Sequence, residues 1–177
     1  MPAIAPSTIA LLVSVALVWT ANGLCFTLLA VRLNAEGYSA SDVGIVTTGY
    51  FVGQLVGAIF CGWMIERVGH VRAFAAFASI ISASVIGYAL YVDLTVWTVL
   101  RTVHGMCIAG SVMVAESWLN GATSNQGRGR LLAVYTIIQY LAMSAGQQLL
   151  NLEAPTSFVL FTVASILFSL ALVPLVL

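Results

Sequence analysis

Lysine is absent from this chain, and charged residues of either sign are scarce. Only 7% of its 177 residues are charged, whereas 61% are hydrophobic and the mean hydropathy is +1.06. Soluble domains carry about 25% charged residues. This composition therefore excludes an ordinary soluble domain and predicts a protein that crosses a membrane several times. The net charge of zero and the lack of a basic patch give no sign of nucleic acid as a partner.

Cysteines with the spacing of a metal site are also lacking. Cys25, Cys61 and Cys107 lie in apolar runs and share no such spacing, so we interpret them as small buried residues. The run from His104 to Cys107 offers soft ligands that suit Cu(I). However, Met106 and Cys107 lie at about +140° and −120° from Arg101 on the helical wheel, and one helix cannot gather such ligands around one ion. We therefore expect no metal site and no cofactor.

A cleaved signal sequence is not indicated at the N-terminus. Residues 1–7 carry no positive side chain, and the apolar run over residues 8–31 exceeds the roughly 7–15 residues of a signal's hydrophobic region. That run is long enough for a transmembrane helix, which needs about 20 residues.

Long hydrophobic runs dominate what the chain does contain, and short polar or charged turns separate them. Such turns must lie at a membrane surface, since lipid cannot solvate them. The pattern predicts an all-α membrane protein with six transmembrane helices in a single domain over residues 1–177. The helices are expected at about residues 8–33, 40–65, 71–92, 95–119, 131–150 and 158–177. Ser39 or Ser41 can cap the second helix, and residues 120–130 are expected to form a polar, glycine-rich loop.

Arginine placement predicts which turns face the cytoplasm. The odd-numbered turns hold only Arg32, whereas the second and fourth turns hold Arg67, Arg72, Arg128 and Arg130. Because the positive-inside rule counts Lys and Arg, we place the second and fourth turns and both termini in the cytoplasm.

Two charges, Arg101 and Glu116, lie inside the fourth apolar run rather than in a turn. A charge within a membrane costs at least a few kcal/mol, so it should face protein or water and marks a candidate functional site. At about 100° per residue, His104 and Glu116 lie about 60° to either side of Arg101, which predicts one polar stripe. Arg101 and Glu116 are roughly 22 Å apart along the helix, so they cannot pair.

An enzyme is the weakest interpretation of these residues. Glu116 and His104 lie roughly 18 Å apart along the helix, so they cannot act as one acid/base site without other residues. No serine-nucleophile or metallo-site pattern occurs in the sequence. We therefore expect no enzymatic activity.

Other polar residues occur within the predicted helices. Asn22 and Gln139, together with Arg101, His104 and Glu116, are candidates for a solute cavity or for coupling. The competing interpretation is that a lone Asn or Gln makes a helix–helix hydrogen bond. His104 can titrate near neutral pH and serve a proton-coupled step. Alternatively, it is a neutral histidine bonded to a neighbouring helix.

Glycines recur every four residues in the second helix, at Gly49, Gly53 and Gly57. They therefore stack on one helix face, and such a face lets two helix backbones approach closely in a bilayer. The spacing predicts a helix-packing interface.

Two motifs resemble the signatures of the major facilitator superfamily of secondary transporters. The turn from Gly62 through Glu66-Arg67 and Gly69 to Arg72 is similar to the first signature, with Glu66 in place of Asp and His70 in place of Arg. Residues 101–110, which begin with Arg101 and contain Gly105, resemble the second signature. Segments 114–117, 127–135 and 146–149 further resemble the YcaD-type branch of bacterial sugar or multidrug permeases.

The resemblance implies two six-helix halves around a central cavity, each built from a 3+3 inverted repeat, with alternating access between them. It implies that Glu66 and Arg67 belong to a cytoplasmic latch that contacts the other half, and that Arg101 serves proton or ligand coupling. A salt bridge within the tight turn is the alternative role for Glu66 and Arg67. The full set assigned to the latch is Gly62, Glu66, Arg67, Gly69, Arg72, Arg128 and Arg130.

The chain ends at Leu177, after the sixth predicted helix. On this basis the glycine face of the second helix is expected to lack a partner, and the polar stripe of the fourth helix is expected to face lipid. Three explanations remain open: the chain is a fragment, it pairs with itself or with a separate second half, or it docks as an accessory subunit of a larger membrane complex.

Transport is the leading prediction from the sequence. The chain would be half of a proton-coupled carrier for a small solute, located as a multi-pass protein in a bacterial inner membrane. The alternative is a structural or assembly subunit that moves nothing. The expected partners are membrane lipid, a second six-helix half or a larger complex, and a small-molecule substrate or ion.

Overall fold

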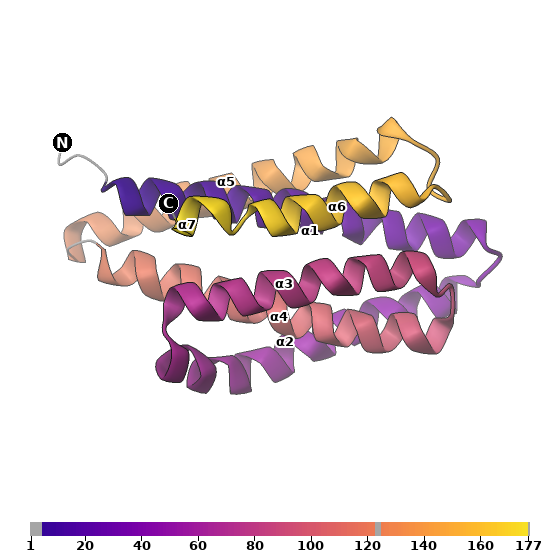
Figure 1. The fold of residues 1–177 in the computed structure, drawn as a ribbon, viewed down its shortest axis with the longest axis horizontal. Coiled ribbons are helices and arrows are strands. Elements are labelled where there is room, and N and C mark those ends of the chain that lie inside the picture. Colours follow the sequence, from indigo (N-terminus) through magenta and orange to yellow (C-terminus); the bar gives the residue numbers. More distant parts are fainter. Residues whose placement is uncertain (1–4, 123–124, 177) are drawn as a thin grey trace.

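The computed structural model describes residues 5–122 and 125–176, and over this part of the chain it is helical without any strand (Figure 1). The all-α prediction is therefore confirmed. The elements are α1 (Pro6–Ala35), α2 (Ala40–Val68), α3 (His70–Leu90), α4 (Leu94–Gly121), α5 (Asn125–Gln148), the 3-10 turn η1 (Leu149–Leu152), α6 (Phe158–Leu170) and α7 (Val173–Val176).

Five segments are long and apolar enough to cross a membrane: α1, α2, α3, α4 and the stretch Phe158–Val176. Each of the six predicted helices has a counterpart, but α5 is more polar than the others and falls outside these five. Its length and its position beside α1 are nevertheless those of another helix in the bundle (Figure 1).

The predicted loop over residues 120–130 is largely helical, so its bounds were wrong. Helix α4 continues to Gly121 and α5 already begins at Asn125, which places Arg128 and Arg130 in the first turns of α5. Glycine costs a helix only about 1 kcal/mol relative to Ala, so Gly127 and Gly129 weaken this start without breaking it. Thr123, Ser124 and Leu177, which fall in the predicted loop and sixth helix, lie outside the described residues, as do residues 1–4 of the predicted domain.

Side-chain caps explain where several helices begin. Ser39, one of the two candidates, caps α2 through a capping box with Asp42, in which the Asp42 N–H donates to the Ser39 hydroxyl and the Ser39 N–H donates to the Asp42 carboxylate. Asp93 accepts from the Val96 N–H at the start of α4. Gly69 separates α2 from α3 in a single residue, with a φ of 88° that favours glycine.

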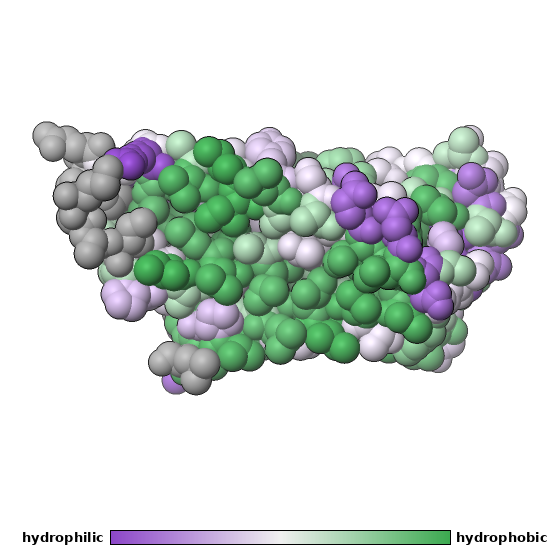
Figure 2. Space-filling model, turned by 90° about the horizontal axis from the view of Figure 1, so that it is seen from above, coloured by the Kyte–Doolittle hydropathy of each residue, from purple (hydrophilic) through white to green (hydrophobic). Residues whose placement is uncertain are grey.

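The helices run back and forth along the long axis of the molecule (Figure 1). The start of α1, the α2/α3 turn, the end of α4, the start of α5 and α7 lie at one end, and the turns α1/α2, α3/α4 and η1/α6 lie at the other. Figure 2 shows a broad hydrophobic surface along the length of the molecule, with hydrophilic residues mainly toward its ends. Five or more apolar helices with this surface describe a multi-pass membrane protein.

Helices α2 and α4 cross in close backbone contact. Gly53 lies against the carbonyl group of Thr102, and Gly105 lies against that of Tyr50, so a Cβ on either glycine would overlap the facing oxygen. The same face of α2 carries Gly49, Gly53 and Gly57, all of which contact α4. The expectation that this face lacks a partner is therefore wrong, because α4 of the same chain covers it.

A second close crossing joins α1 to α5. Gly23 lies against the carbonyl group of Met143, and Gly146 lies against that of Thr20. Both crossings thus use the same arrangement. On each helix, the carbonyl group of one residue faces the partner's glycine, and the helix's own glycine follows three residues later. The first residue is Thr on α1 and α4, Met143 on α5 and Tyr50 on α2. Small residues that let helix backbones touch are a common basis of helix association in membranes.

Candidate binding site inside the helical bundle

Arg101 lies within the bundle and not at its surface. Its side chain extends from α4, is 2% exposed, and places its guanidinium carbon 5.0 Å from the ring centroid of Tyr50 and 5.4 Å from that of Phe26. These cation–π contacts stabilise the positive charge electrostatically. They provide no lone pair for its N–H groups, and Nε and Nη1 are buried without a hydrogen-bond partner among the described residues.

Tyr50 of α2 connects Arg101 to two amide side chains. Its hydroxyl oxygen accepts from Asn22 Nδ2 of α1 at 3.3 Å and from Gln54 Nε2 of α2 at 3.4 Å. The hydroxyl in turn donates only a long hydrogen bond of 3.5 Å to Asn22 Oδ1. Asn22 is 1% exposed, so this group joins α1, α2 and α4 deep inside the bundle.

His104 lies one turn further along α4 and is completely buried. Its Nδ1 lies 3.5 Å from the Tyr88 hydroxyl of α3, and its ring packs edge-on against Tyr50 and Phe168 at centroid distances of 5.9 and 5.5 Å. His104 Nε2 has no hydrogen-bond partner in the described part of the chain. We refer to Asn22, Tyr50, Gln54, Tyr88, Arg101 and His104 as the interior polar cluster.

The predicted polar stripe on α4 divides in the structure. Arg101 and His104 face the bundle, so the expectation that the stripe faces lipid is wrong. Glu116 is exposed, although its neighbour Ala115 is buried. The physical reason is that Glu116 lies on the opposite side of Arg101 from His104, just beyond the edge of the buried face of α4.

Gln139, like Glu116, is a predicted cavity residue that lies apart from the interior polar cluster. It lies half-buried on α5, and no hydrogen bond between described residues connects it to the interior polar cluster. Of the five candidate cavity residues, the structure therefore brings together Asn22, Arg101 and His104.

No carboxylate of the described residues forms an ion pair with Arg101. Among residues 5–122 and 125–176, the single ion pair joins Arg32 to Glu36 at 2.7 Å near the end of α1. The other acidic residues lie at helix ends, in turns or on the surface: Asp42, Glu66, Asp93, Glu116 and Glu153. The interior polar cluster thus carries one positive charge without a negative partner from this part of the protein.

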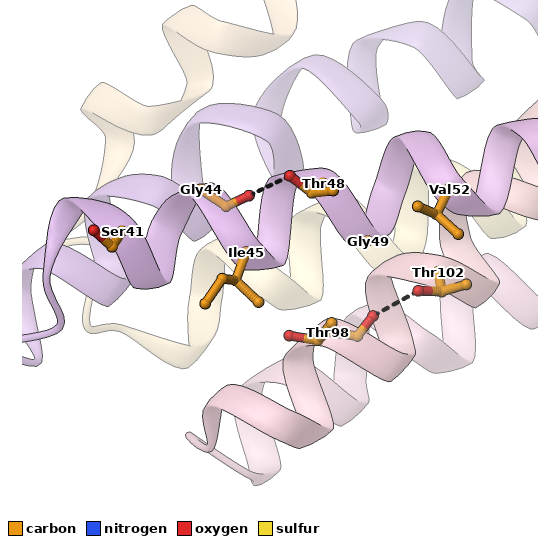
Figure 3. A pocket seen from close by; sticks show the side chains of 8 residues that line it. All are labelled: Ser41, Gly44, Ile45, Thr48, Gly49, Val52, Thr98 and Thr102. Atoms are coloured by element: carbon orange, nitrogen blue, oxygen red, sulfur yellow. Dashed lines mark hydrogen bonds between the residues drawn. The ribbon is translucent and has the colours of Figure 1, made fainter.

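A surface groove of about 480 Å³ lies between α2 and α4, on the side of the α1/α2 turn (Figure 3). It is lined by Ser41, Gly44, Ile45, Thr48, Gly49, Val52, Thr98 and Thr102. The hydroxyls of Thr48 and Thr102 donate to the carbonyls of Gly44 and Thr98 in their own helices, at 2.8 and 2.9 Å. With these donors in use, the groove presents mainly methyl groups and backbone.

The residues predicted as a latch lie at the end of the bundle that holds the α2/α3 and α4/α5 turns. Glu66 and Arg67 occupy the last turn of α2 and are exposed, and no ion pair within 4.0 Å joins them among the described residues. The guanidinium of Arg67 instead lies 5.1 Å from the ring centroid of Trp63. The structure thus does not contain the salt bridge that was the alternative role for this pair.

The remaining latch residues are spread over neighbouring helix ends. Arg72 and Arg130 are exposed, Gly62 is half-buried on α2, and Arg128 donates to the Asn120 carbonyl at 3.3 Å. His70 hydrogen-bonds through Nε2 to the Ser117 hydroxyl at 2.9 Å and so joins the start of α3 to the end of α4.

The sequence analysis missed the aromatic residues that surround Arg101 and His104. Tyr50, Tyr88, Phe26 and Phe168 come from four different helices, and helix rotation cannot be read from one sequence. One signal was available: Thr20-Ala-Asn-Gly23 and Thr102-Val-His-Gly105 repeat the same pattern. Each of these segments forms half of a close crossing in the structure.

Comparison with known proteins agrees with this architecture. The sequence profile of the Major Facilitator Superfamily matches residues 11–177. The chain is 34% identical over 125 residues to the protein called "Uncharacterized MFS-type transporter YcaD" in Escherichia coli strains O139:H28, O157:H7 and K12 DH10B. The match covers 71% of this chain and 33% of each relative, so it spans about a third of these longer proteins. On this evidence, the chain belongs to the Major Facilitator Superfamily and is a YcaD-like member of it.

Proposed function

We propose that this chain forms one six-helix half of a secondary active transporter, which moves a small solute by alternating access and is driven by protons. The observation that carries the proposal is Arg101, a cation that is 2% exposed inside a membrane-spanning bundle and has no ion-pair partner among the described residues. Such a charge is costly, and intramembrane charges typically serve solute pathways or coupling. The membership in a transporter family supports the same conclusion.

The proposed architecture is a single domain over residues 1–177 built from two inverted three-helix repeats. The paired crossings support this arrangement. Helix α1 meets α5 through Thr20 and Gly23, and α4 meets α2 through Thr102 and Gly105, each with the same spacing. Inverted repeats place binding sites near their interface, at the bilayer midplane. We assign the solute or coupling role to Asn22, Arg101 and His104, and we propose that Tyr50 acts with them.

The charged helix ends are proposed to form a cytoplasmic latch with the second half of the transporter. The exposed, unpaired carboxylate of Glu66 at the end of α2 supports this role, because it is free to accept a partner from another segment. Charges at helix ends can bias one packed arrangement over another. The latch would comprise Gly62, Glu66, Arg67, Gly69, Arg72, Arg128 and Arg130.

The proposed setting is a bacterial inner membrane, with the charged latch end and both termini on the cytoplasmic side. The second six-helix half would come from another chain, from a second copy or from the remainder of a longer protein. An accessory subunit is not favoured, because the polar face of α4 that suggested it is covered by this chain's own helices. We assign no enzymatic activity to the protein.

Mass and transport measurements on the extracted protein test this proposal. The mass and composition of the particle in mild detergent should correspond to two six-helix halves. After reconstitution into vesicles that contain a pH-sensitive dye, neutral, anionic or cationic solutes from a panel are added. At least one solute should move protons, and Arg101→Ala and Glu66→Ala should abolish this movement while assembly persists. A particle built with unrelated proteins, together with no solute-dependent flux, would contradict the proposal.

A further inference from the structure

Charge balance around Arg101 indicates the chemical class of the solute. The guanidinium is buried in the bundle, and each of the six acidic residues lies at a helix end, in a turn or on the surface. An unpaired charge in a membrane interior is unfavourable by several kcal/mol. A bound anion would remove that cost, whereas a neutral solute would leave it in place and a cation would increase it.

The free groups of Arg101 lie on the two edges of the guanidinium at which a carboxylate can bind. The planar guanidinium has two donor edges, Nε with Nη2 and Nη1 with Nη2. Nε and Nη1 both lack a partner in the part of the chain that the structure describes, so each edge keeps a free donor. Parallel N–H donors of this kind bind the two oxygens of a carboxylate. The aromatic rings of Phe26 and Tyr50, at 5.4 and 5.0 Å, stabilise the cation without occupying these donors.

Tyr50 offers a further donor next to the guanidinium. Its oxygen accepts from Asn22 Nδ2 and Gln54 Nε2, but its own proton is held only by a long contact of 3.5 Å to Asn22 Oδ1. A small rotation of the hydroxyl would therefore allow it to donate to an anion on Arg101. Two amides that donate to a phenol oxygen also fix the position of that oxygen.

We propose that the interior polar cluster binds a small monocarboxylate, with one edge of the Arg101 guanidinium, Nε/Nη2 or Nη1/Nη2, forming a two-point contact and the Tyr50 hydroxyl donating a third hydrogen bond. A single positive charge matches a single negative charge. The surrounding Phe26 and Phe168 suit an apolar remainder of the solute. This inference rests on the proposed transport function and specifies its substrate class.

Equilibrium binding to the purified 177-residue chain in detergent tests the inference at pH 7. The probes are acetate, propionate, lactate and benzoate, each compared with its neutral amide of nearly equal shape, and chloride serves as a compact anion without carboxylate geometry. At least one carboxylate should bind about tenfold or more tightly than its amide, because hydrogen bonds to charged groups are the strong ones. Chloride should compete weakly.

Three variants separate the two-point contact with Arg101 from general effects of charge. Arg101→Gln should lose most carboxylate binding, Arg101→Lys should retain a minor part, and Tyr50→Phe should weaken carboxylates several-fold while leaving the amides unchanged. Arg32→Gln changes a partly buried arginine that is paired with Glu36 near the end of α1, outside the interior polar cluster, and this variant should bind as the wild type does. Elution and thermal unfolding of each variant show that it is folded, and Tyr50→Phe keeps the test decisive if Arg101→Gln does not fold.

Several results would overturn the inference. They are an absence of carboxylate binding, equal binding of carboxylates and amides, chloride that competes as well as a carboxylate, or full carboxylate binding by Arg101→Gln. If a neutral solute crossed the membrane independently of Arg101, the proposal that the solute is an anion would be wrong, but the proposed transport function would still hold. Carboxylate binding without any flux would contradict transport and leave the binding site standing.

Discussion

The two close helix crossings share a backbone arrangement but differ in chemistry. At each crossing a Thr-x-x-Gly segment and a facing glycine bring two helices into carbonyl contact. Three matched positions differ: Arg101 lies where α1 has Trp19, His104 where it has Asn22, and Tyr50 of α2 where α5 has Met143. The crossing of α2 and α4 therefore carries the buried charge and most of the polar groups, whereas that of α1 and α5 is mainly apolar.

This difference indicates a division between scaffold and site. Both crossings need glycine, because the backbones touch, and this requirement is independent of function. Only the crossing of α2 and α4 contains an ionised side chain. Such a side chain is costly in a membrane interior and therefore marks a functional site. Asn22 connects the two, since it lies on α1 and donates to Tyr50 of α2. Substitutions at matched positions can therefore separate folding from function.

The largest expected effect comes from filling either glycine contact. Gly53→Leu and Gly146→Leu should each destabilise the protein by about 3 kcal/mol or more, because the new side chain must displace a backbone carbonyl. Thermal unfolding and the yield of monodisperse protein in detergent measure the loss. Gly44→Leu is the control on α2, since nothing lies within 4 Å of a Cβ there. If Gly146→Leu alone were tolerated, the two crossings would not be equivalent scaffolds.

Opposite responses are expected at the matched pair Arg101 and Trp19. Arg101→Leu should abolish solute flux and yet raise the stability by about 1–3 kcal/mol, because it removes an unpaired buried charge. Trp19→Leu should lower the stability by about 1 kcal/mol through lost packing, with flux largely retained. Unfolding curves and vesicle uptake on the same preparations give both quantities. A loss of stability in Arg101→Leu would mean that the arginine is a structural residue.

How far these regions could be anticipated from the sequence depends on the physical signal. Apolar runs of about 20 residues predict helices well, and the capping pattern at Ser39 located the start of α2. An arginine within such a run is visible by itself, so Arg101 was found. The rotation of each helix is not visible. For this reason the aromatic partners Tyr50 and Phe26 were missed, and the polar face of α4 was assigned to lipid.

The prediction of where α5 begins was wrong for a different reason. Glycine and polar residues over 125–130 resemble a loop by composition, but a helix tolerates them at its solvated end. Composition alone therefore placed Arg128 and Arg130 in a turn. The close crossings could be anticipated in part, because the repeated Thr-x-x-Gly pattern can be read in the sequence. Which helix each pattern contacts depends on the fold.

A smaller difference is expected at the matched pair Tyr50 and Met143. Tyr50→Phe should cost about 1–2 kcal/mol, because the buried amide of Asn22 and the half-buried amide of Gln54 lose their shared acceptor. Met143→Leu conserves volume and should cost well under about 1.5 kcal/mol. Thermal unfolding of both variants checks the comparison. An equal cost at the two positions would show that the hydrogen bonds to Tyr50 contribute nothing to stability.

The smallest effect is expected at Thr20 and Thr102, and it tests whether the crossings share a scaffold. Each hydroxyl donates to a carbonyl four residues earlier in its own helix, at 2.8 and 2.9 Å, so neither bonds across the crossing. Thr20→Ala and Thr102→Ala should therefore change the stability equally, within about 0.5 kcal/mol. Thr102 also lines the surface groove between α2 and α4. If Thr102→Ala reduced solute affinity while Thr20→Ala did not, the solute would contact that groove, and the functional difference between the crossings would extend beyond the interior polar cluster.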